Sequence, residues 1–335
     1  MVTTMQDVAR LAGVSAKTVS NVVNGTGYVS ATTRSRVESA IRSLDYKLNL
    51  AGRTLRSGRS GVIGLAVPSL SVAYFAELAE RVIAAAEAFG LVVQIERTGS
   101  VDRERSFLAS ARVHHLDGLI FNPSDHLADE LTSVALPVPT VILGEHAVGP
   151  GAVHVSSDQS AAARVATQHL LDVGRRQIVA IGARTVDPRH AASLRFAGYR
   201  HALDAAGVAF DPELVCEADP WNQMNGANAA RELLATGTRF DAVVAFNDSL
   251  ALGAMRALEE AGLRVPADVA IIGIDNIAES EFSIPSLSTV DLGSTQTAEE
   301  AVRALVDQLG TDVPAEPRHI VVDFRLVARE STAAG

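Results

Sequence analysis

Near the start of the chain, apolar residues recur at positions i, i+3 and i+4, which is the spacing of one face of an α-helix. Three stretches show this spacing, so we predict helices over residues 5–12, 16–24 and 31–44. The residues expected to face inward are Val8, Leu11 and Ala12 in the first helix, Val19, Val22 and Val23 in the second, and Val37, Ala40, Ile41 and Leu44 in the third.

Helix start and stop signals frame the first two helices. Thr4 stands three residues before Asp7, which is the spacing of a capping box, and Ser15 precedes the second helix as its N-cap. Gly13 ends the first helix. Two short helices joined by a Gly-containing turn and closed by a third helix are typical of a helix-turn-helix domain.

From residue 61 onward, short runs rich in Val and Ile alternate with amphipathic stretches, which predicts parallel sheets with right-handed crossover helices. The pattern occurs twice, so the expected fold is an all-α helix-turn-helix head followed by an α/β body of two similar doubly wound parallel-sheet subdomains. The expected strands cover 62–67, 91–95, 118–121, 140–143, 178–181, 214–216, 242–246, 269–274 and one long strand over 320–327. The expected helices cover 75–89, 103–112, 159–171, 192–206, 225–234, 249–260 and 296–309.

These patterns give the expected domain boundaries. The helix-turn-helix head covers 1–48, a hinge helix and linker cover 49–60, and the body covers 61–335. Within the body, the first subdomain takes about 61–158 and 291–319, and the second takes about 159–290 and 320–335.

Composition narrows the class of protein. A length of 335 residues and a hydrophobic fraction of 47% fit a multidomain globular chain. Cys216 is the single cysteine, which excludes an intramolecular disulfide and a cysteine-based metal cluster. No apolar run approaches the roughly 18 residues that span a bilayer, and the charged first twenty residues lack the apolar segment of a secretory signal. We therefore expect a soluble, cytoplasmic protein with no membrane partner.

Charge is unevenly distributed along the chain. The formal net charge is −10, yet residues 1–60 hold nine basic and three acidic residues. The remainder holds 20 basic and 36 acidic residues. A basic head on an acidic body indicates that the head alone faces nucleic acid, because the body repels the phosphate backbone.

The second helix presents small and hydrogen-bonding side chains outward, as a helix in the major groove requires. Lys17 suits guanine and Asn21 suits adenine in that groove. A small three-helix protein-interaction bundle is the alternative. The remaining candidates for DNA contact in the head are Thr4, Ser15, Ala16, Thr18, Ser20, Asn24, Ser30, Thr33 and Arg34.

The head resembles that of the lac-repressor/galactose-repressor (LacI/GalR) family. The resemblance rests on DVARLAGVSAKTVSNVVN, on the later VSATTR and on Tyr46. It implies a homodimeric transcriptional regulator, a repressor, that binds a pseudo-palindromic double-stranded operator and answers to a small molecule.

The family's hinge helix would fall on residues 49–56. In the family a leucine from each subunit wedges into the minor groove, and Leu55 occupies that position, next to Arg56. A linker residue that packs on its own body is the alternative for Leu55. This chain has Leu48 where the family commonly has Pro, and Gly52 where it has Ala, so the hinge should depend on DNA for folding.

The resemblance also implies a periplasmic-binding-protein-like body, with a ligand in the cleft at the carboxyl ends of the strands. Polar and aromatic residues follow the predicted strands there. Arg195 in SLRFAGYRHAL, Asn247 in FNDSLALGAMRAL and Asp275 in IGIDN match ligand contacts of the family. The other candidates are Trp221, which matches a stacking aromatic but could also pack in its loop, Arg189, and Tyr74 and Phe75 after the first strand.

A carboxylate, an amide and a guanidinium beside an aromatic ring favour a sugar-like effector, while Arg189 keeps a nucleoside or purine effector open. We expect Asp248 to cap its helix rather than to bind the ligand. Phosphate-binding glycine motifs, nucleophile motifs and metal-ligand spacings are absent from the sequence, so neither an enzyme nor a cofactor or metal is expected. A solute-binding protein with the same body is the remaining alternative, although such a protein would not need the helix-turn-helix head.

Overall fold

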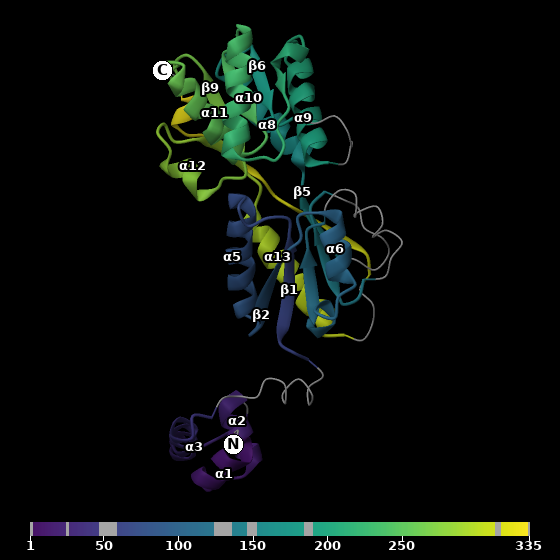
Figure 1. Ribbon diagram of the computed structural model, residues 1–335, viewed down its shortest axis with the longest axis vertical. Helices are drawn as coiled ribbons and strands as arrows, with labels where there is room; N and C mark the ends of the chain where they lie inside the picture. Colours follow the sequence, from purple (N-terminus) through teal and green to yellow (C-terminus); the bar gives the residue numbers. More distant parts are fainter. Residues whose placement is uncertain are drawn as a thin grey trace. The chain divides into compact units, whose positions relative to one another are not determined.

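The computed structural model describes residues 3–24, 27–46, 59–123, 136–145, 153–183, 190–311 and 316–333. It divides into two compact units, Met1–Ser60 and Gly61–Gly335 (Figure 1). Among the described helices, none combines the length and the apolar character that crossing a bilayer requires. The expected hinge residues Leu48, Gly52, Leu55 and Arg56, and the cleft candidate Arg189, lie outside the described residues.

The first unit is a three-helix head whose capping follows the sequence signals. Thr4 and Asp7 form the capping box of the first helix, and Gly13, with a φ of 63°, ends it. Because this φ lies in the left-handed region, a residue without a Cβ fits there best. The helices are α1 (Met5–Ala12), α2 (Ala16–Asn24) and α3 (Ala31–Ser43).

The core of the head forms where the three helices meet, around the fully buried Val8, Val19 and Val37. The expectation for Leu11 is wrong, because this side chain is 57% exposed while Ala9 is buried. At 100° per residue, the buried face of α1 is centred between Val8 and Ala9, and Leu11 points more than a quarter-turn away from it.

The second unit contains two sheets. Among the described residues the first sheet has strands β1 (Val62–Val67), β2 (Val92–Arg97), β3 (Gly118–Phe121), β4 (Thr140–Leu143), β5 (Val153–Ser157) and β11 (Arg318–Val322). The second sheet has β6 (Ile178–Ile181), β7 (Val215–Cys216), β8 (Ala242–Ala245), β9 (Ala270–Ile274), β10 (Ser288–Asp291) and β12 (Arg325–Val327). Their orders are β11-β5-β4-β3-β1-β2 and β12-β10-β9-β8-β6-β7. All pairs are parallel except β10 with β12.

Helices cover both faces of each sheet, as the predicted doubly wound architecture requires. The helices of the first sheet are α5 (Ala73–Glu87), α6 (Val101–Leu108) and α13 (Ser294–Leu309), with α5 and α13 on one face and α6 on the other (Figure 1). Those of the second sheet are α8 (Gln159–Asp172), α9 (Ala191–Ala205), α10 (Gln223–Thr236), α11 (Asp248–Glu260) and the short α12 (Ala278–Phe282). Single 3₁₀ turns lie at Val113–His115, Pro212–Leu214 and Glu330–Thr332.

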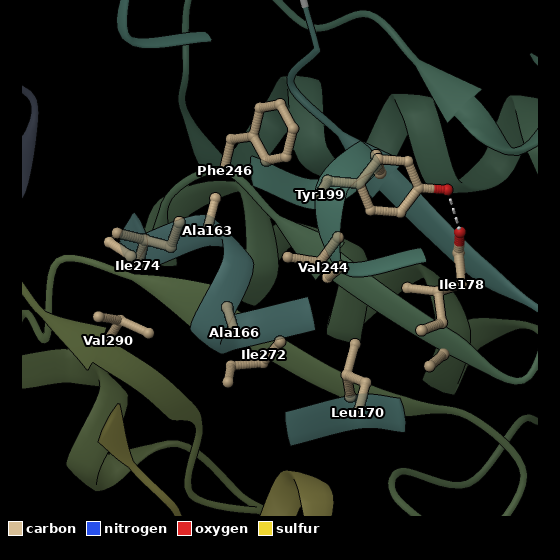
Figure 2. Packing of buried hydrophobic residues seen from close by; sticks show 14 of the residues in the cluster. Ala163, Ala166, Leu170, Ile178, Tyr199, Val244, Phe246, Ile272, Ile274 and Val290 are labelled. Atoms are coloured by element: carbon tan, nitrogen blue, oxygen red, sulfur yellow. Dashed lines mark hydrogen bonds between the residues drawn. The ribbon is translucent and has the colours of Figure 1, made fainter. Parts of the chain in front are cut away.

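The core of the second sheet lies under α8 and α9, where Val244 and Ile272 of the strands meet Ala166 and Leu170 of α8 (Figure 2). Tyr199 of α9 is fully buried in this cluster, and its hydroxyl donates to the carbonyl oxygen of Ile178 at 2.8 Å. The hydroxyl therefore has the partner that a buried polar group needs.

We call the first sheet with its helices the first lobe, and the second sheet with its helices the second lobe. The chain passes between the lobes three times, from β5 to α8, from β10 to α13 and from β11 to β12. The expected long strand 320–327 is therefore wrong: it is two strands, and each belongs to a different sheet. Residues 320–322 lie in the first lobe, not in the second as expected, because β11 pairs with β5 there.

Two strands were not predicted. β5 and β10 are short, and each carries polar residues inside the strand, namely His154 and Ser156 in β5 and Ser288 and Thr289 in β10. These polar residues are buried in strands that lead into the crossovers between the lobes, so the apolar pattern of a strand is interrupted in the sequence.

Candidate DNA-reading helix and effector cleft

The start of α2, at residues 15–17, is exposed and carries polar side chains. Ser15 caps it, since its Oγ accepts from the backbone N–H of Thr18 at 3.1 Å and lies 2.9 Å from Thr18 Oγ1. Ala16 and Lys17 are exposed, whereas Ser20 and Asn21 are half-buried. Val19 and Val22 are buried on the opposite face. The helix therefore presents its first turn outward while its apolar face fixes it to the head.

Several hydroxyl groups expected to face phosphates are engaged in caps. Thr4 Oγ1 donates to Asp7 Oδ2 at 2.6 Å, which together with the Thr4 backbone lowers the pKa of Asp7. Ser30 Oγ donates to Thr33 Oγ1 at 3.0 Å, which leaves the hydroxyl hydrogen of Thr33 for another acceptor. Asn24 lies at the end of α2.

Two arginines of α3 have different environments. The Arg36 guanidinium donates to the Ala12 carbonyl oxygen at 2.7 Å and to that of Gly13 at 3.1 Å. It therefore ties α3 to the C-terminal end of α1. The Arg34 guanidinium has no hydrogen-bond or ion-pair partner within the part of the chain that the structure describes. Sequence reasoning also missed Tyr28, which is 98% exposed between α2 and α3. An aromatic residue between Gly27 and Val29, outside the predicted helices, was the available signal.

A cavity of about 580 Å³ lies between the lobes. Of the seven cleft residues named from the sequence, six line it: Tyr74, Phe75, Arg195, Trp221, Asn247 and Asp275. They come from five different helices and loops in the two lobes, and the first lobe contributes Tyr74 and Phe75 from the start of α5. The cavity size suits a small molecule of the size of a sugar or a nucleoside.

Arg195 lies at the centre of the second lobe's contribution. It is 4% exposed, and its Nε donates to Gln159 Oε1 at 2.7 Å, while one terminal nitrogen donates to the Phe246 carbonyl oxygen. The other terminal nitrogen lies 3.4 Å from Asp275 Oδ1. Its Cζ also lies 5.0 Å from the ring centre of Trp221. Protein groups thus orient this cation and occupy its donors before any ligand arrives.

Asp275 combines burial with an unusual backbone. Burial raises the pKa of its carboxyl to about 8, against the opposing effect of Arg195. Its φ is 125°, and that of the following Asn276 is 56°. Such conformations cost about 1–3 kcal/mol each in a non-glycine residue, so the surrounding structure must hold them, which is typical of binding sites.

The expectation that Asp248 caps α11 is wrong. Asn247 is the N-cap, since its Oδ1 accepts from the Leu250 backbone N–H at 2.8 Å. Asp248 is fully buried and accepts hydrogen bonds from Thr289 Oγ1 at 2.6 Å and Ser280 Oγ at 2.7 Å. Burial raises the pKa of Asp248 to about 6, although these hydrogen bonds oppose the rise. Asn247 takes the cap because α11 begins at Asp248, which places the N-cap one residue before the aspartate.

Aromatic rings form one side of the cavity. The Trp221 ring packs edge-on against His190 and Phe246, and Tyr74 packs edge-on against Phe75 with ring centres 5.2 Å apart. Burial raises the pKa of the Tyr74 hydroxyl, and the Asp275 carboxylate adds to that rise. These rings offer faces for stacking, next to hydroxyl and carboxyl groups for hydrogen bonding.

Other lining residues were not named as ligand contacts from the sequence. They include Asn122, Glu145, Gln159, His190 and Asp219. Position after a strand was an available signal for Asn122 and Glu145, which follow β3 and β4. Gln159, His190 and Asp219 are brought to the cavity by crossover and loop geometry. Within the described ranges, no group of three His, Cys, Asp or Glu side chains could hold a metal ion.

Comparison with known proteins matches both units. The family described as "Bacterial regulatory proteins, lacI family" matches residues 4–49, and a "Periplasmic binding protein-like domain" matches residues 167–332. The ribose operon repressor of Halalkalibacterium halodurans is 34% identical over 99% of this chain and 98% of its own length. The chain belongs to the LacI family of bacterial regulators.

Solved structures of LacI-family regulators agree with the fold. A lac repressor dimer bound to operator and the anti-inducer ONPF has a TM-score of 0.81 at 27% identity and covers 99% of each chain. A complex of the regulator CelR with cellobiose has a TM-score of 0.72 at 32% identity, covering 98% of this chain and 99% of that one. The relatives are transcriptional regulators with a DNA-binding domain, not enzymes.

Proposed function

We propose that this LacI-family regulator is a repressor that binds a pseudo-palindromic operator as a homodimer and is controlled by a small polar effector in the cavity. The observation that carries this proposal is the joint presence of an exposed helix-turn-helix and a cavity lined from both lobes by aromatic and hydrogen-bonding residues. Regulation of chromosomal promoters would place its action in the cytoplasm.

Different residues of the head are suited to contact base edges and to contact phosphates. Lys17 and Asn21 lie on the first two turns of α2, where side chains reach base edges when such a helix enters the major groove. The Arg34 guanidinium, which has no partner among the described residues, is suited to a phosphate. The exposed Tyr28 adds a hydroxyl and a flat apolar ring to the same proposal. Two copies are needed because one short helix reads too few base pairs for specificity in a genome.

Exposed apolar side chains on the second lobe support the homodimer. Phe282 is 78% exposed, Ile284 is 97% exposed and Met224 is 72% exposed. Ile284 borders a surface groove of about 430 Å³ that Leu252 and Met255 of α11 also line. Single exposed apolar residues are ordinary, but Phe282 and Ile284 lie two residues apart beside this groove, and such a pair is typical of a protein interface. We assign this surface to a second copy of the chain, because the family acts through paired half-sites.

The charge of the cavity favours an uncharged, hydroxyl-rich effector. Arg195 is already bonded to Gln159, Phe246 and Asp275, whereas Glu145 and Asp219 add further acidic groups to the lining. Carboxylates accept hydrogen bonds from sugar hydroxyls, and Trp221 can stack on the apolar face of a sugar ring. The complex of a relative with cellobiose supports the same class. A nucleoside or purine is the second candidate, since its flat base would stack on Trp221.

Selection of genomic fragments by the full-length protein tests the proposal. We expect enrichment of a two-fold symmetric sequence, and release of that sequence by one member of a panel of sugars, nucleosides and purines. Lys17→Ala or Asn21→Ala should relax the base preference. Enrichment without symmetry and without any response to the panel would contradict the proposed function.

A further inference from the structure

A hydrogen bond joins the two lobes beside the cavity, apart from the three crossover segments. The backbone N–H of Ala278, the first residue of α12, donates to Glu77 Oε1 at 2.7 Å. Glu77 lies on α5 of the first lobe, and α12 of the second lobe lies next to it (Figure 1). Arg81, one turn along α5, donates to Glu77 Oε2 at 3.0 Å and orients the carboxylate.

The segment that supplies this N–H also carries a cavity residue. Asp275 lines the cavity, and Asp275 and Asn276 both hold left-handed backbone conformations just before Ala278. The preceding N–H, that of Ile277, donates to Asp248 Oδ2 at 3.0 Å. Two consecutive N–H groups are therefore held by carboxylates from opposite lobes, Asp248 from the second and Glu77 from the first.

The same helix face carries a second cavity residue. Tyr74 and Glu77 are three residues apart on α5, so they lie on one side of the helix. Tyr74 lines the cavity, and its hydroxyl is close enough to Asp275 for that carboxylate to raise its pKa. One face of α5 therefore carries both a cavity-lining ring and the acceptor of the hydrogen bond to the turn 275–278.

We propose that Glu77 is a latch that holds the lobes together over the cavity and positions the turn that presents Asp275 to the effector. The latch accepts the Ala278 N–H only while the lobes enclose the cavity. Effector binding between the lobes and formation of this hydrogen bond then favour the same arrangement, so each stabilises the other. The assignment of the cavity to an effector rests on the proposed function, whereas the latch itself can be tested without an effector.

The geometry makes the contact sensitive to small movements. A hydrogen bond of 2.7 Å is lost once the two atoms are about 1 Å further apart, so a slight opening at α12 breaks it. The side chains of Glu77 and Arg81 are only 23% and 30% exposed, so water can only partly make up for the lost hydrogen bond. Because the acceptor is ionised, we expect its loss to shift the closed-to-open equilibrium about tenfold towards the open arrangement.

Trp221 gives a direct readout, because it is the single tryptophan of the chain and lines the cavity. We would measure acrylamide quenching of its fluorescence in the full-length protein without effector or DNA. Glu77→Ala should increase the quenching constant. Glu77→Gln, which keeps an oxygen acceptor but loses the charge and the pair with Arg81, should fall between the parent and the Ala variant. Glu87→Gln, an exposed carboxylate near the other end of α5, is the matched control.

Ala278→Pro tests the donor from the other lobe. Proline lacks the N–H but fits the first position of a helix, and Ile277, with φ −68° and ψ 158°, already has the backbone that precedes proline. This variant should raise quenching as Glu77→Ala does, and the double variant should show no further increase. Parental quenching in both single variants, or additive increases in the double variant, would overturn the latch. Failure of the selected DNA to respond to effectors would instead count against the proposed function.

Discussion

Asn247 joins the start of α11 to the loop that carries Trp221: its Oδ1 caps the helix, and its Nδ2 donates to the Trp221 carbonyl oxygen at 3.4 Å. One amide therefore sets both a helix end and the position of the aromatic ring that faces the cavity. The family resemblance implies a ligand contact at this position. The observed geometry shows that the side chain also has a structural task, and the two tasks can be separated by substitution.

Replacing Asn247 by Ser or Ala should separate the cap from the contact with the Trp221 loop. Ser keeps an oxygen that can cap α11, whereas Ala removes it, which should lower the free energy of unfolding by about 1 kcal/mol more than Ser does. Both variants lose the amide donor, so both should alter Trp221 fluorescence. Urea unfolding and emission spectra check this, and equal stability of the Ser and Ala variants would contradict the cap.

Asp275 should make stability depend on pH. Because burial raises its pKa to about 8, above the value in the unfolded chain, the folded protein binds more protons than the unfolded protein between roughly pH 4 and 8. Stability contributed by this group is therefore lost as the pH rises through that window. Relative to Asp275→Asn, the parent should lose about 1 kcal/mol of unfolding free energy per pH unit near neutrality. Urea titrations from pH 5 to 8.5 measure the difference, and parallel pH profiles for the two proteins would refute the assignment.

The charge of the cavity should discriminate between neutral and phosphorylated ligands. Among the described lining residues, Arg195 is the one arginine or lysine, and Gln159, Phe246 and Asp275 already bind it, so a phosphate finds no uncommitted cation there. We expect a sugar that raises the melting temperature to bind at least about tenfold more tightly than its phosphate ester. Ribose with ribose 5-phosphate and glucose with glucose 6-phosphate are matched pairs. A larger shift with the ester would contradict the expectation and point to a cation outside the described residues.

Arg34 and Arg36 should behave differently although they are two residues apart on α3. Arg36→Ala removes the donors to the Ala12 and Gly13 carbonyl oxygens and should destabilise the head by about 1–2 kcal/mol. Arg34→Ala should leave the head stable but weaken binding to every duplex and reduce the salt slope by about one. Hydrogen exchange over residues 3–46 and salt titrations on random-sequence DNA distinguish the two. Loss of head protection in the Arg34 variant would overturn this division.

The homodimer surface should be sensitive to charge at Ile284. Burying a carboxylate in an apolar interface is costly, so Ile284→Asp should shift sedimentation towards the monomer and weaken operator binding. Val321→Asp is the control, because Val321 is 57% exposed on β11, at the edge of the first sheet, and lies outside the proposed surface. An unchanged dimer in the Ile284 variant would exclude this surface from the interface.

Local patterns of residues determined much of this protein in advance. The capping box of Thr4 and Asp7, the turn at Gly13 and the burial of Val19 and Val22 all follow from neighbours within a few positions. The doubly wound body follows likewise, because Val- and Ile-rich strands and amphipathic helices have periods that a sequence displays directly. The six described cleft residues could be named because parallel strands end at a common edge, and because motifs of the family mark the positions of Arg195, Asn247 and Asp275.

Only the tertiary structure decided which partner each of these side chains meets. The apolar residues between Ile320 and Val327 predict a single strand from the sequence. In the structure, Asp323 and Phe324 separate two strands, and these belong to different sheets. The position of Asp248 in the sequence predicts a helix cap, but its carboxylate accepts hydrogen bonds from α12 and β10. Glu77 likewise accepts from a backbone N–H that is 201 residues away. Periodicity and capping depend on residues a few positions apart, whereas these contacts depend on how two lobes cross and pack, which no short stretch of the chain encodes.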